Sequence, residues 1–322
     1  MAPRDLEHGP GIGVRAQAGQ KGPDILPGGV VRGQAGLRAR CGPRAGPFVA
    51  GLQREAVGVD HAAVSLTVCI MTLNEEANLP RLFASIEGLG AEIAVLDSHS
   101  TDRTREIARA AGALVLEEDW RGWTQQRTRT LELGSGDWIL CMDADEWLDD
   151  ALRDAILTAM AGAPEDVDGF ALNRRTRYLG GWIDHCGWSP EWRVRLVRRG
   201  KVQCVGIDPH DRLEVNGRSL NLDSGRLNHL PYPTLAAHIN KVNHYTTEMA
   251  RQRAERGMRP TLAKLVLRPA WRFFRMYVLR RGFLDGWRGL VLCSVGGFYV
   301  FLKYAKLREF SRDRTCVSDD DA

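Results

Sequence analysis

The chain has 322 residues, 44% of them hydrophobic and 26% charged, which fits one large globular domain with appendages. Its seven cysteines are scattered and form no CxxC pair, which argues against a disulfide framework and a zinc site and for a reducing compartment. No run reaches the roughly 18 uninterrupted apolar residues that a membrane-spanning helix needs, and no apolar core follows the first basic residues as in a signal peptide. We therefore expect a cytoplasmic protein.

The net charge of +4 is distributed unevenly along the chain. Residues 264–309 contain ten Lys or Arg and two acidic residues, a local charge of +8, which leaves −4 for the rest of the chain. A basic C-terminal arm on a mildly acidic body predicts a polyanionic partner surface. Nucleic acid and an anionic membrane surface are the two candidates. No nucleic-acid-binding motif accompanies the charge, so we expect the membrane surface and no nucleic acid.

Residues 1–63 are dominated by Gly, Ala, Arg and Pro, as in GPGIGVRAQAGQKGPDILPGG. They show no helical or strand periodicity and contain few large apolar residues, so they cannot bury enough surface to offset the entropy lost on ordering. We predict that this segment is disordered. A basic arm for nucleic acid is the alternative, but the aromatic interleaving of such arms is absent.

From residue 64 onward, short apolar runs alternate with helical patterns. Residues 64–71 form a β-rich run, and the helix that follows from about residue 77 carries apolar side chains at helical spacing, namely Leu79, Leu82, Phe83 and Ile86. The plan repeats in a strand at 93–96 with a helix capped by Ser100 or Asp102, a strand within 113–119, a helix at 123–133 and a strand within 137–147. This alternation predicts a parallel sheet with helices on both faces.

Polar residues follow these strands at their carboxyl ends, where sheets of this kind bind ligands. They are Thr72, Asn74 and Glu75 after the first strand, Asp97 and Ser98 after the second, and Asp143 and Asp145 after the fourth. The predicted fold brings all of them to one edge of the sheet.

Four interpretations compete for the acidic turn Asp143-Ala144-Asp145, of which a solvated turn is the simplest. An EF-hand loop is excluded, because Trp147 takes a ligand position and Leu148 the position of the obligatory Gly. A phosphate-binding loop is excluded, because the chain contains neither GxxxxGKS nor GxxxxGKT. The fourth is a site for Mg²⁺ or Mn²⁺, since these ions prefer oxygen ligands and are held by one or two carboxylates together with substrate phosphates. The position of the turn at a strand end in a βα array favours the metal site.

The segments TLNEEANLPRLFASI, VLDSHSTDRTREIA and GDWILCMDADEWL resemble the nucleotide-sugar half of family 2 glycosyltransferases, which have the GT-A fold. Two later segments, NRRTRYLGGWIDHCGWSPEWRVRLVRRGK and RRGFLDGWRGLVLCSVGGFYVFLKYAKL, are similar to the bacterial lipopolysaccharide inner-core β-glucosyltransferases within that family. The resemblance covers roughly residues 65–310. The fold class that we expect is therefore α/β: a GT-A, Rossmann-like nucleotide-sugar-binding domain with a C-terminal amphipathic helical extension that associates with membranes.

By position, the resemblance implies that Thr72, Asn74 and Glu75 line the nucleotide pocket. It further implies that Asp97 accepts a hydrogen bond from the uracil or the ribose, and that Asp143 faces the ribose and the metal.

The resemblance also implies that Asp145 ligates a Mg²⁺ or Mn²⁺ ion on the diphosphate. His229 is a candidate for a further metal ligand, and a satisfied core histidine is the alternative. Gln126 and Arg127 are candidate pocket residues, with an exposed helix face as the alternative. His99 stands where the family usually has Gly.

An inverting transfer is a single displacement, so a base must take the proton of the acceptor hydroxyl from the face opposite the leaving group. The metal stabilises the charge that develops on the leaving oxygen. Asp211 in GIDPHDRLEV, beside His210, stands where similar sequences carry His-Glu and is the first candidate for the base. Glu191 in SPEWRVRL is the second, although its Trp and Arg neighbours favour a structural ion pair.

The basic arm contains a predicted helix that begins at Pro269, a residue suited to a first helical turn, and ends at about residue 281. Aromatic and apolar side chains share one face and arginines lie towards the other: Phe273, Phe274, Tyr277 and Val278 against Arg268, Arg272 and Arg275. Basic amphipathic helices of this composition lie in membrane interfaces. An apolar stripe packed on the body of the protein is the alternative.

We therefore expect a disordered extension over residues 1–63, a GT-A domain over 64–235, a basic helical membrane-associating region over 236–312 and a disordered tail over 313–322. The resemblance implies a metal-dependent, inverting hexosyltransferase, peripheral on the inner face of the cytoplasmic membrane. It would move glucose from UDP-glucose onto a lipid-linked saccharide, an inner-core heptose of lipopolysaccharide. The alternatives are another sugar, a polyprenyl-phosphate or other cell-envelope glycan acceptor and, in a different class, a non-catalytic sugar-nucleotide or membrane-binding protein.

Overall fold

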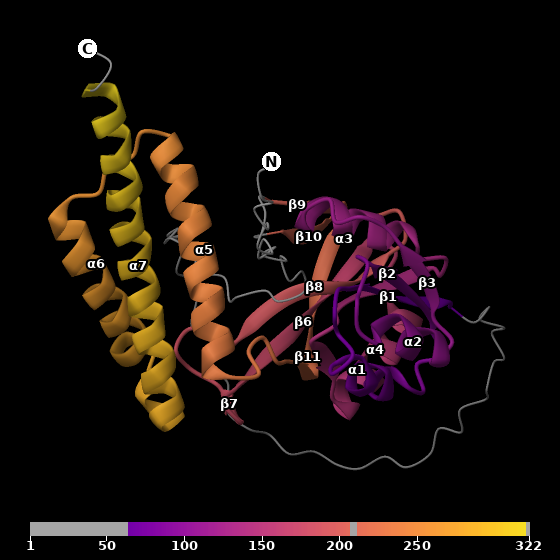
Figure 1. Ribbon diagram of the computed structural model, residues 1–322. Coiled ribbons are helices and arrows are strands. Elements are labelled where there is room, and N and C mark those ends of the chain that lie inside the picture. Colours follow the sequence, from indigo (N-terminus) through magenta and orange to yellow (C-terminus); the bar gives the residue numbers. More distant parts are fainter. Residues whose placement is uncertain (1–63, 207–210, 320–322) are drawn as a thin grey trace, which may run out of the picture.

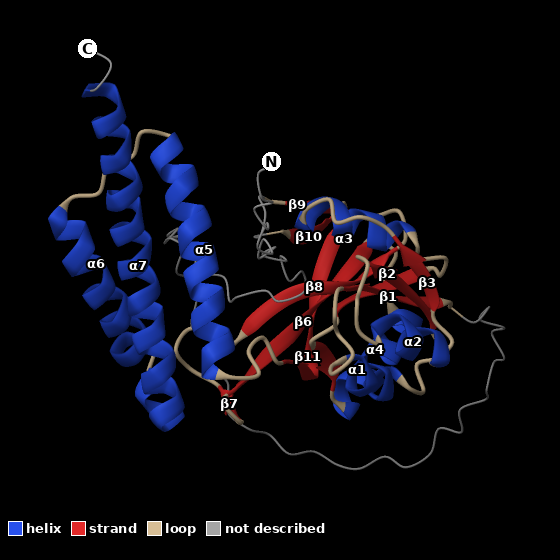
Figure 2. Cartoon of the chain, viewed as in Figure 1, coloured by secondary structure: helices blue, strands red, loops and turns tan. Residues whose placement is uncertain are grey.

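The computed structural model describes residues 64–206 and 211–319 (Figure 1). The expected disordered extension, residues 1–63, lies outside the described residues. In the described part, an α/β body lies beside a layer of long helices formed by the C-terminal part of the chain (Figures 1 and 2).

The first half of the body alternates strands and helices as the sequence predicts. Its elements are β1 (Leu66–Thr72), α1 (Leu79–Ile86), β2 (Glu92–Asp97), α2 (Thr104–Ala110), β3 (Leu114–Glu117), α3 (Trp123–Glu132) and β4 (Trp138–Asp143). Every residue of β1 and β4 is buried, which is why both strands appear in the sequence as largely apolar runs. The N-cap residue of α2 is Arg103 rather than the predicted Ser100 or Asp102, although the Asp102 carboxylate accepts the amide of Thr104, the first residue of the helix, at 3.0 Å.

The second half of the body adds β5 (Glu146–Leu148), α4 (Asp150–Gly162), β6 (Val167–Tyr178), β7 (Gly181–Ile183), β8 (Glu191–Arg198), β9 (Val202–Val205), β10 (Arg212–Val215) and β11 (Arg218–His229). The main sheet has the strand order β3-β2-β1-β4-β8-β6-β11-β5, with β7 paired to β6, while β9 and β10 form a small ribbon.

The expectation of a parallel sheet is correct for the first half of the body and wrong for the second. Strands β3, β2, β1 and β4 are parallel, whereas β8 is antiparallel to both of its neighbours, β4 and β6. A short hairpin joins β6 to β7, and the chain then returns through β8, so the strand direction reverses without a crossover helix.

The register of the parallel strands places their carboxyl ends together. Thr72 pairs with Asp97 across β1 and β2, and Met71 pairs with Asp143 across β1 and β4. The polar residues that follow these strands therefore lie at one edge of the sheet, as the sequence predicts.

The helical layer consists of α5 (Leu235–Glu255), α6 (Leu262–Phe274) and α7 (Gly286–Asp319), with a π-helical turn η1 (Arg275–Leu279) and a 3₁₀ turn η2 (Gly282–Asp285) between α6 and α7. Helix α7 packs against both α5 and α6 (Figure 1). It continues to residue 319, so it extends into the range 313–322 that the sequence analysis assigned to a disordered tail.

A buried apolar cluster fastens the helical layer to the body. It joins side chains of the body to side chains of η1 and α7: Tyr178, Ile183, Cys186, Trp188 and Tyr232 on one side and Met276, Leu292 and Cys293 on the other. Asp285 adds a polar contact, because its carboxylate accepts the backbone amides of Asp184 and His185 at 3.2 and 3.0 Å. The layer therefore has a defined position on the body.

The predicted helix start at Pro269 is wrong. Helix α6 begins at Leu262, where the Thr261 hydroxyl accepts the amide of Lys264 at 3.3 Å, and Pro269 lies inside the helix. Thr261 is thus the N-terminal cap that marks the start in the sequence. Helix α7 packs closely on the proline, since a Cβ added at Gly297 would lie 3.2 Å from the Pro269 carbonyl oxygen.

The apolar residues of this segment take both of the predicted roles. Phe273 and Tyr277 pack inward against the apolar cluster, whereas Phe274 and Val278 are exposed. Arg268 turns towards α7 and donates to the Tyr304 hydroxyl at 2.7 Å.

The segment Gly282–Ser311 is long and apolar enough to cross a membrane by length and composition, and its most apolar 18-residue stretch has a mean hydropathy of 1.4. No such segment was predicted from the sequence, because Ser294, Gly296 and Gly297 interrupt the apolar run. Within the protein, 44% of its most apolar stretch is buried, and the core helices of soluble proteins share these properties. Length and composition alone therefore do not indicate a crossing.

Candidate active site

Asp97 holds together the loops that follow β1 and β2. Its side chain is fully buried and accepts hydrogen bonds from the Thr72 hydroxyl at 2.8 Å, the Ser100 amide at 2.8 Å and the Ser100 hydroxyl at 2.5 Å. Asn74 lies in the left-handed region with a φ of 56°, and its amide donates to the Ser100 hydroxyl at 2.8 Å. Thr72, Asn74 and Asp97 therefore form one network at the sheet edge. Asn74 is exposed there.

Glu75 begins the turn into α1 and is buried beside the same edge. Its amide donates to the Thr104 hydroxyl at 2.7 Å, and its carboxylate accepts the Asn78 side-chain amide at 2.7 Å. Burial, and secondarily the nearby Asp145 carboxylate, raise the pKa of Glu75 to about 8.

His99, which follows β2, has a left-handed backbone conformation with a φ of 60°. Glycine adopts this left-handed conformation without strain, which explains the glycine usual at this position in the resembling family. The imidazole is exposed and lies 3.0 Å from the Asp119 carboxylate.

Gln126 and Arg127 in α3 lie inside the protein, so the alternative of an exposed helix face is excluded. Both side chains are about 1% exposed. The Gln126 side-chain amide donates to the Ser98 hydroxyl at 3.1 Å, which links α3 to the end of β2. Arg127 donates to Asp143 at 2.8 Å and pairs with Asp211 through its Nε.

Buried arginines surround the acidic turn. Arg195 in β8 donates to the carboxylates of Asp143 at 2.5 Å and of Glu146 at 2.7 Å, and Arg174 in β6 lies 3.3 Å from Glu146. Burial alone would raise the pKa of Asp143, but Arg127 and Arg195 hold it well below its usual value. Asp143 therefore stays ionised and fixed in place.

Asp145 and His229 form the pair that the sequence proposes as metal ligands. Their side chains are almost completely buried, and His229 Nε2 lies 3.5 Å from Asp145 Oδ2. Strand β11 brings them together, because His229 pairs with Glu146 of β5 in the register and the Leu230 amide donates to the Asp145 carbonyl at 3.0 Å.

This pair fits a hard divalent cation. Neither carboxylate oxygen of Asp145 nor Nε2 of His229 has a hydrogen-bond partner among the described residues, although all three atoms are buried. Buried carboxylates normally have a partner or coordinate a metal. Within residues 64–206 and 211–319 no group of three or more His, Cys, Asp or Glu could hold an ion, so a Mg²⁺ or Mn²⁺ ion bound to this pair would need further ligands such as substrate phosphates and water.

The two carboxylates proposed as the base are both paired with arginine. Asp211 is buried at the start of β10 and pairs with Arg127. Glu191 at the start of β8 accepts both Nε and Nη2 of Arg174, at 2.9 and 2.7 Å, and also pairs with Arg193. Burial raises the pKa of Glu191, but the two arginines outweigh it and lower the pKa to about 2. The structural ion pair that the sequence favours for Glu191 is present.

Lys241 in α5 also belongs to this site and was not predicted from the sequence. Its ammonium group is buried, and Asp145, Glu75 and Asp143 are the carboxylates that attract it. It lies in the second turn of α5, beyond the last strand of the body, and belongs to no motif, so only the packing of α5 identifies it.

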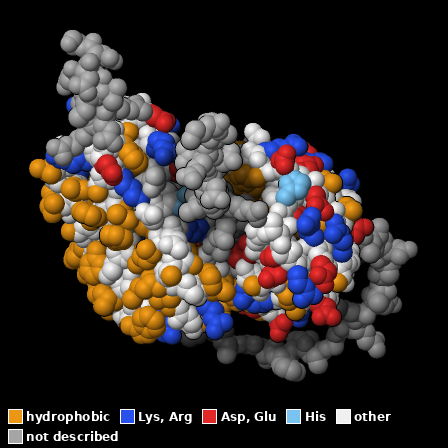
Figure 3. Space-filling model, viewed as in Figure 1, with side chains coloured by type: hydrophobic (Ala, Val, Ile, Leu, Met, Phe, Trp, Pro, Cys, Tyr) orange, Lys and Arg blue, Asp and Glu red, His pale blue; other side chains and the backbone are white. Residues whose placement is uncertain are grey.

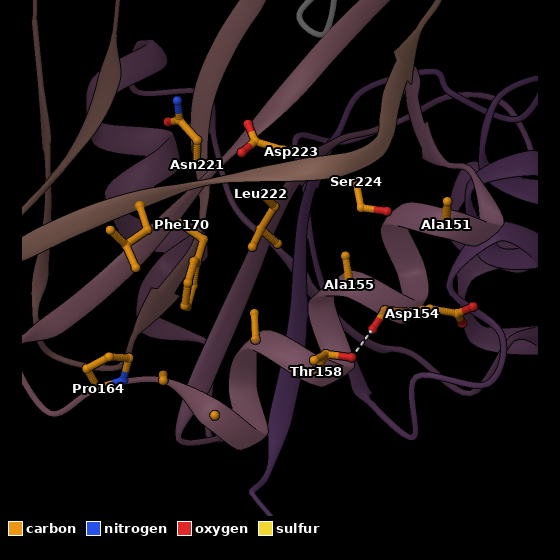
Figure 4. A pocket seen from close by; sticks show the side chains of 14 residues that line it. Ala151, Asp154, Ala155, Thr158, Pro164, Phe170, Asn221, Leu222, Asp223 and Ser224 are labelled. Atoms are coloured by element: carbon orange, nitrogen blue, oxygen red, sulfur yellow. Dashed lines mark hydrogen bonds between the residues drawn. The ribbon is translucent and has the colours of Figure 1, made fainter. Parts of the chain in front are cut away.

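A separate groove of about 760 Å³ lies between α4 and the middle of β11 (Figure 4). Its walls include Phe170, Leu222 and Thr158 and none of the proposed site residues. It therefore has no part in the site at the sheet edge.

The chain was compared with known families and structures. The family model described as Glycosyl transferase family 2 matches residues 67–205. The chain is 34% identical over 268 residues to the lipopolysaccharide core biosynthesis glycosyltransferase LpsC of Rhizobium meliloti (strain 1021), an alignment that covers 80% of this chain and 97% of the relative. It is 28% identical over 265 residues to the uncharacterized glycosyltransferase RT0209 of Rickettsia typhi, covering 79% of this chain and 91% of the relative.

Among solved structures, the mannosyltransferase PcManGT of Pyrobaculum calidifontis, in complex with GDP-Man and Mn²⁺, matches with a TM-score of 0.43 and 15% identity over 77% of this chain and 88% of that one. The family match, the alignment with LpsC and the observed α/β body with its helical layer confirm the predicted fold class, an α/β GT-A domain with a C-terminal helical extension. The long alignment with LpsC and the family match across β1 to β9 show that the chain belongs to glycosyl transferase family 2.

Proposed function

We propose that this protein is a metal-dependent, inverting hexosyltransferase of lipopolysaccharide core biosynthesis. It moves glucose from UDP-glucose onto a lipid-linked saccharide, an inner-core heptose. The observation that carries the reaction type is the buried pair of Asp145 and His229, whose ligand atoms have no other partner among the described residues of this family 2 chain. The name of the LpsC relative supports the pathway, and the sequence resemblance supports the donor and the acceptor.

Residues at the carboxyl ends of the strands form the donor half of the proposed site. Thr72, Asn74 and Glu75 are the proposed lining of the nucleotide pocket, with Asn74 as its exposed member. Asp97 already accepts three hydrogen bonds, so its main proposed contribution is the shape of that pocket. Gln126 stabilises the end of β2 through its hydrogen bond to the Ser98 hydroxyl.

Asp145 and His229 would hold Mg²⁺ or Mn²⁺ against the diphosphate. The ion supplies electrostatic stabilisation of the charge that develops on the leaving oxygen. Asp143 lies between two arginines and is fixed before substrate binds, so the turn that presents Asp145 needs little reorganisation.

The acceptor hydroxyl requires a base. Glu191 is a poor one, because Arg174 binds both of its oxygens and the pKa is about 2. Asp211 is the proposed base. Its contact with Arg127 has to open for this role, and Asp211 immediately follows the segment 207–210 that lies outside the described residues.

A lipid-linked acceptor requires the enzyme to reach a membrane surface, and the helical layer presents a suitable face. Large apolar side chains are exposed along α6, η1, η2 and α7, and we name them the apolar face: Leu262, Val266, Leu267, Trp271, Phe274, Val278, Leu279, Phe283, Leu284, Trp287, Leu290, Phe298 and Phe301. Figure 3 shows hydrophobic side chains gathered over this layer, whereas charged side chains are interspersed over the body. Apolar patches of this extent on a protein surface mark interaction sites.

The proposed partner of the apolar face is the anionic leaflet itself, bound in the plane of the membrane. The segment carries the local charge of +8, and each Lys or Arg near an anionic leaflet contributes about 1 kcal/mol. A crossing by α7 would carry α5 into the lipid with it, because the two helices pack together. The exposed residues of α5 include Asn240, Arg251 and Glu255, which disfavours burial of that helix in hydrocarbon.

A panel of nucleotide sugars tests the proposed donor reaction. The full chain is incubated with each sugar nucleotide, with and without Mn²⁺, and release of the nucleoside diphosphate is measured. We expect release from UDP-glucose that requires the metal. No release from any nucleotide sugar, with Mn²⁺ and an inner-core acceptor present, would show that the protein is a binding protein rather than a transferase.

A further inference from the structure

A lysine in the helical layer has a buried ammonium group that forms no hydrogen bond with any of the residues the structure describes. Lys241 lies in the second turn of α5, and its Nζ is buried with no hydrogen-bond partner among the described residues. It forms no ion pair within 4.0 Å in that part of the chain, and its ammonium lies 5.2 Å from the centre of the Tyr232 ring. A buried ammonium group without a hydrogen-bond partner is unfavourable, and an anion bound beside it would stabilise its charged form.

The packing of α5 fixes the direction of this side chain. His238, one turn earlier, stacks on the Tyr232 ring with 4.0 Å between ring centres and shares a hydrogen bond of 2.8 Å with the Tyr178 hydroxyl. Both tyrosines belong to the buried cluster that fastens the helical layer to the body. Helix α5 therefore cannot turn Lys241 towards solvent without breaking these contacts.

The charges around Lys241 are those of the proposed donor site. Asp145, Glu75 and Asp143 attract its ammonium, and Arg174 repels it. Burial is the larger effect and lowers the pKa of Lys241 to about 7, although these carboxylates act in the opposite direction. The lysine thus faces Asp145 from the side of the helical layer without pairing with it.

We propose that Lys241 binds a phosphate group of the nucleoside diphosphate held at Asp145, an inference that rests on the proposed function. A nucleoside diphosphate carries more negative charge than one divalent cation neutralises, and Asp145 adds another negative charge. A lysine ammonium is a compact point charge and a common ligand for phosphate in nucleotide sites. The positive charge of Lys241 offsets the negative charge that the cation leaves on the diphosphate and Asp145. The helical layer thereby becomes part of the donor site.

Calorimetric titration of the full chain in the presence of Mn²⁺ tests this assignment. UDP and uridine are the two ligands, since only UDP carries the phosphates. We expect Lys241→Met to weaken UDP binding by about 10- to 100-fold, the size of a lost hydrogen bond to a charged group, and to leave uridine binding unchanged. Lys241→Arg should restore most of the UDP affinity, because it restores the positive charge.

Lys303→Met is the matched control. Lys303 is also a partly desolvated lysine, with a pKa lowered by burial to about 8, but it lies in α7 among Arg253, Arg268 and Arg272. This variant should bind UDP as the wild type does. A purely structural role for Lys241 would lower the unfolding midpoint of Lys241→Met and reduce the affinities for UDP and uridine alike.

The outcomes separate two failures. Wild-type affinity for UDP in a folded Lys241→Met variant would overturn the assignment of Lys241 and leave the proposed function intact. It would also be the result if the phosphate that Lys241 meets belonged to the acceptor. Failure of the wild type to bind UDP would overturn the proposed function, and the assignment of Lys241 with it.

Discussion

Buried arginines determine which carboxylates of the acidic turn remain available for chemistry. Asp143 is held by Arg127 and Arg195, and Glu146 is held by Arg195 and Arg174. Asp145, between them in the sequence, has no hydrogen-bond partner for either oxygen among the described residues. Asp143 and Glu146 therefore stabilise the structure through their ion pairs, whereas Asp145 is available to bind a ligand.

The assignment of the base predicts opposite results for two conservative variants. Asp211→Asn should keep its affinity for UDP and lose transfer rate by about 10²- to 10⁴-fold in single-turnover measurements, the usual contribution of a general base. Glu191→Gln should mainly lower the free energy of unfolding, because Arg174 loses part of its bidentate ion pair. Near-normal turnover of Asp211→Asn together with an inactive Glu191→Gln would assign the base to Glu191.

Part of the candidate site can be predicted from the sequence, because a polar residue directly after a buried apolar strand is conspicuous. Asp97 and Asp145 were predicted as site residues in this way, and His229 was predicted as a candidate metal ligand. Arg195 and Lys241 were not found. Arg195 lies in a strand that contains other basic residues, so nothing in the sequence distinguishes it. Lys241 lies in a helix that reaches the site only through tertiary packing.

At the scale of elements, the tight connection between η2 and α7 depends on Gly289. A Cβ added there would lie 1.9 Å from the Gly282 carbonyl oxygen. We expect Gly289→Ala to lower the free energy of unfolding by about 1–3 kcal/mol through overpacking, as measured by urea denaturation.

Gly162→Ala is the control for this substitution. Gly162 ends α4, and nothing lies within 4 Å of an added Cβ, so the better helix former should leave stability unchanged or raise it slightly. If both variants unfolded at the same urea concentration as the wild type, the close packing at Gly289 would be contradicted.

The elements differ in how far the sequence predicts them. β1 to β4 and the helices between them were placed correctly, because each strand is a short apolar run and each helix has its own apolar spacing. The start of α6 was misplaced because Pro269 is a strong local signal, whereas Thr261 caps the helix without any other mark in the sequence. The antiparallel strands of the second half depend on pairing between distant segments, which no local pattern encodes.

At the scale of the whole molecule, the apolar face should insert into anionic membranes. Trp271 and Trp287 are 57% and 56% exposed on that face, so lipids brominated in the acyl chains should quench their fluorescence in vesicles that contain anionic lipid. Trp271→Phe and Trp287→Phe should each remove part of the quenchable signal. Trp120→Phe, which alters an exposed tryptophan of the body, should not.

High salt provides a second control for membrane binding. Attraction between basic side chains and anionic lipid weakens with ionic strength, whereas burial of apolar side chains does not. The apolar face would have a different partner if quenching were equal for all three tryptophan variants. The same conclusion would follow if the protein formed a concentration-dependent dimer instead of binding vesicles.

Transfer of labelled glucose from UDP-glucose to an inner-core lipid acceptor in anionic vesicles, in the presence of Mn²⁺, brings the donor site, the metal ligands and the apolar face into one measurement. We expect the wild type to transfer glucose and to lose this activity when the metal is chelated. Asp145→Ala should also lose transfer. Its unfolding midpoint should be preserved or raised, because the substitution removes a buried carboxylate that has no hydrogen-bond partner among the described residues. Wild-type transfer by a folded Asp145→Ala variant with metal present would contradict the assignment of the metal-dependent site.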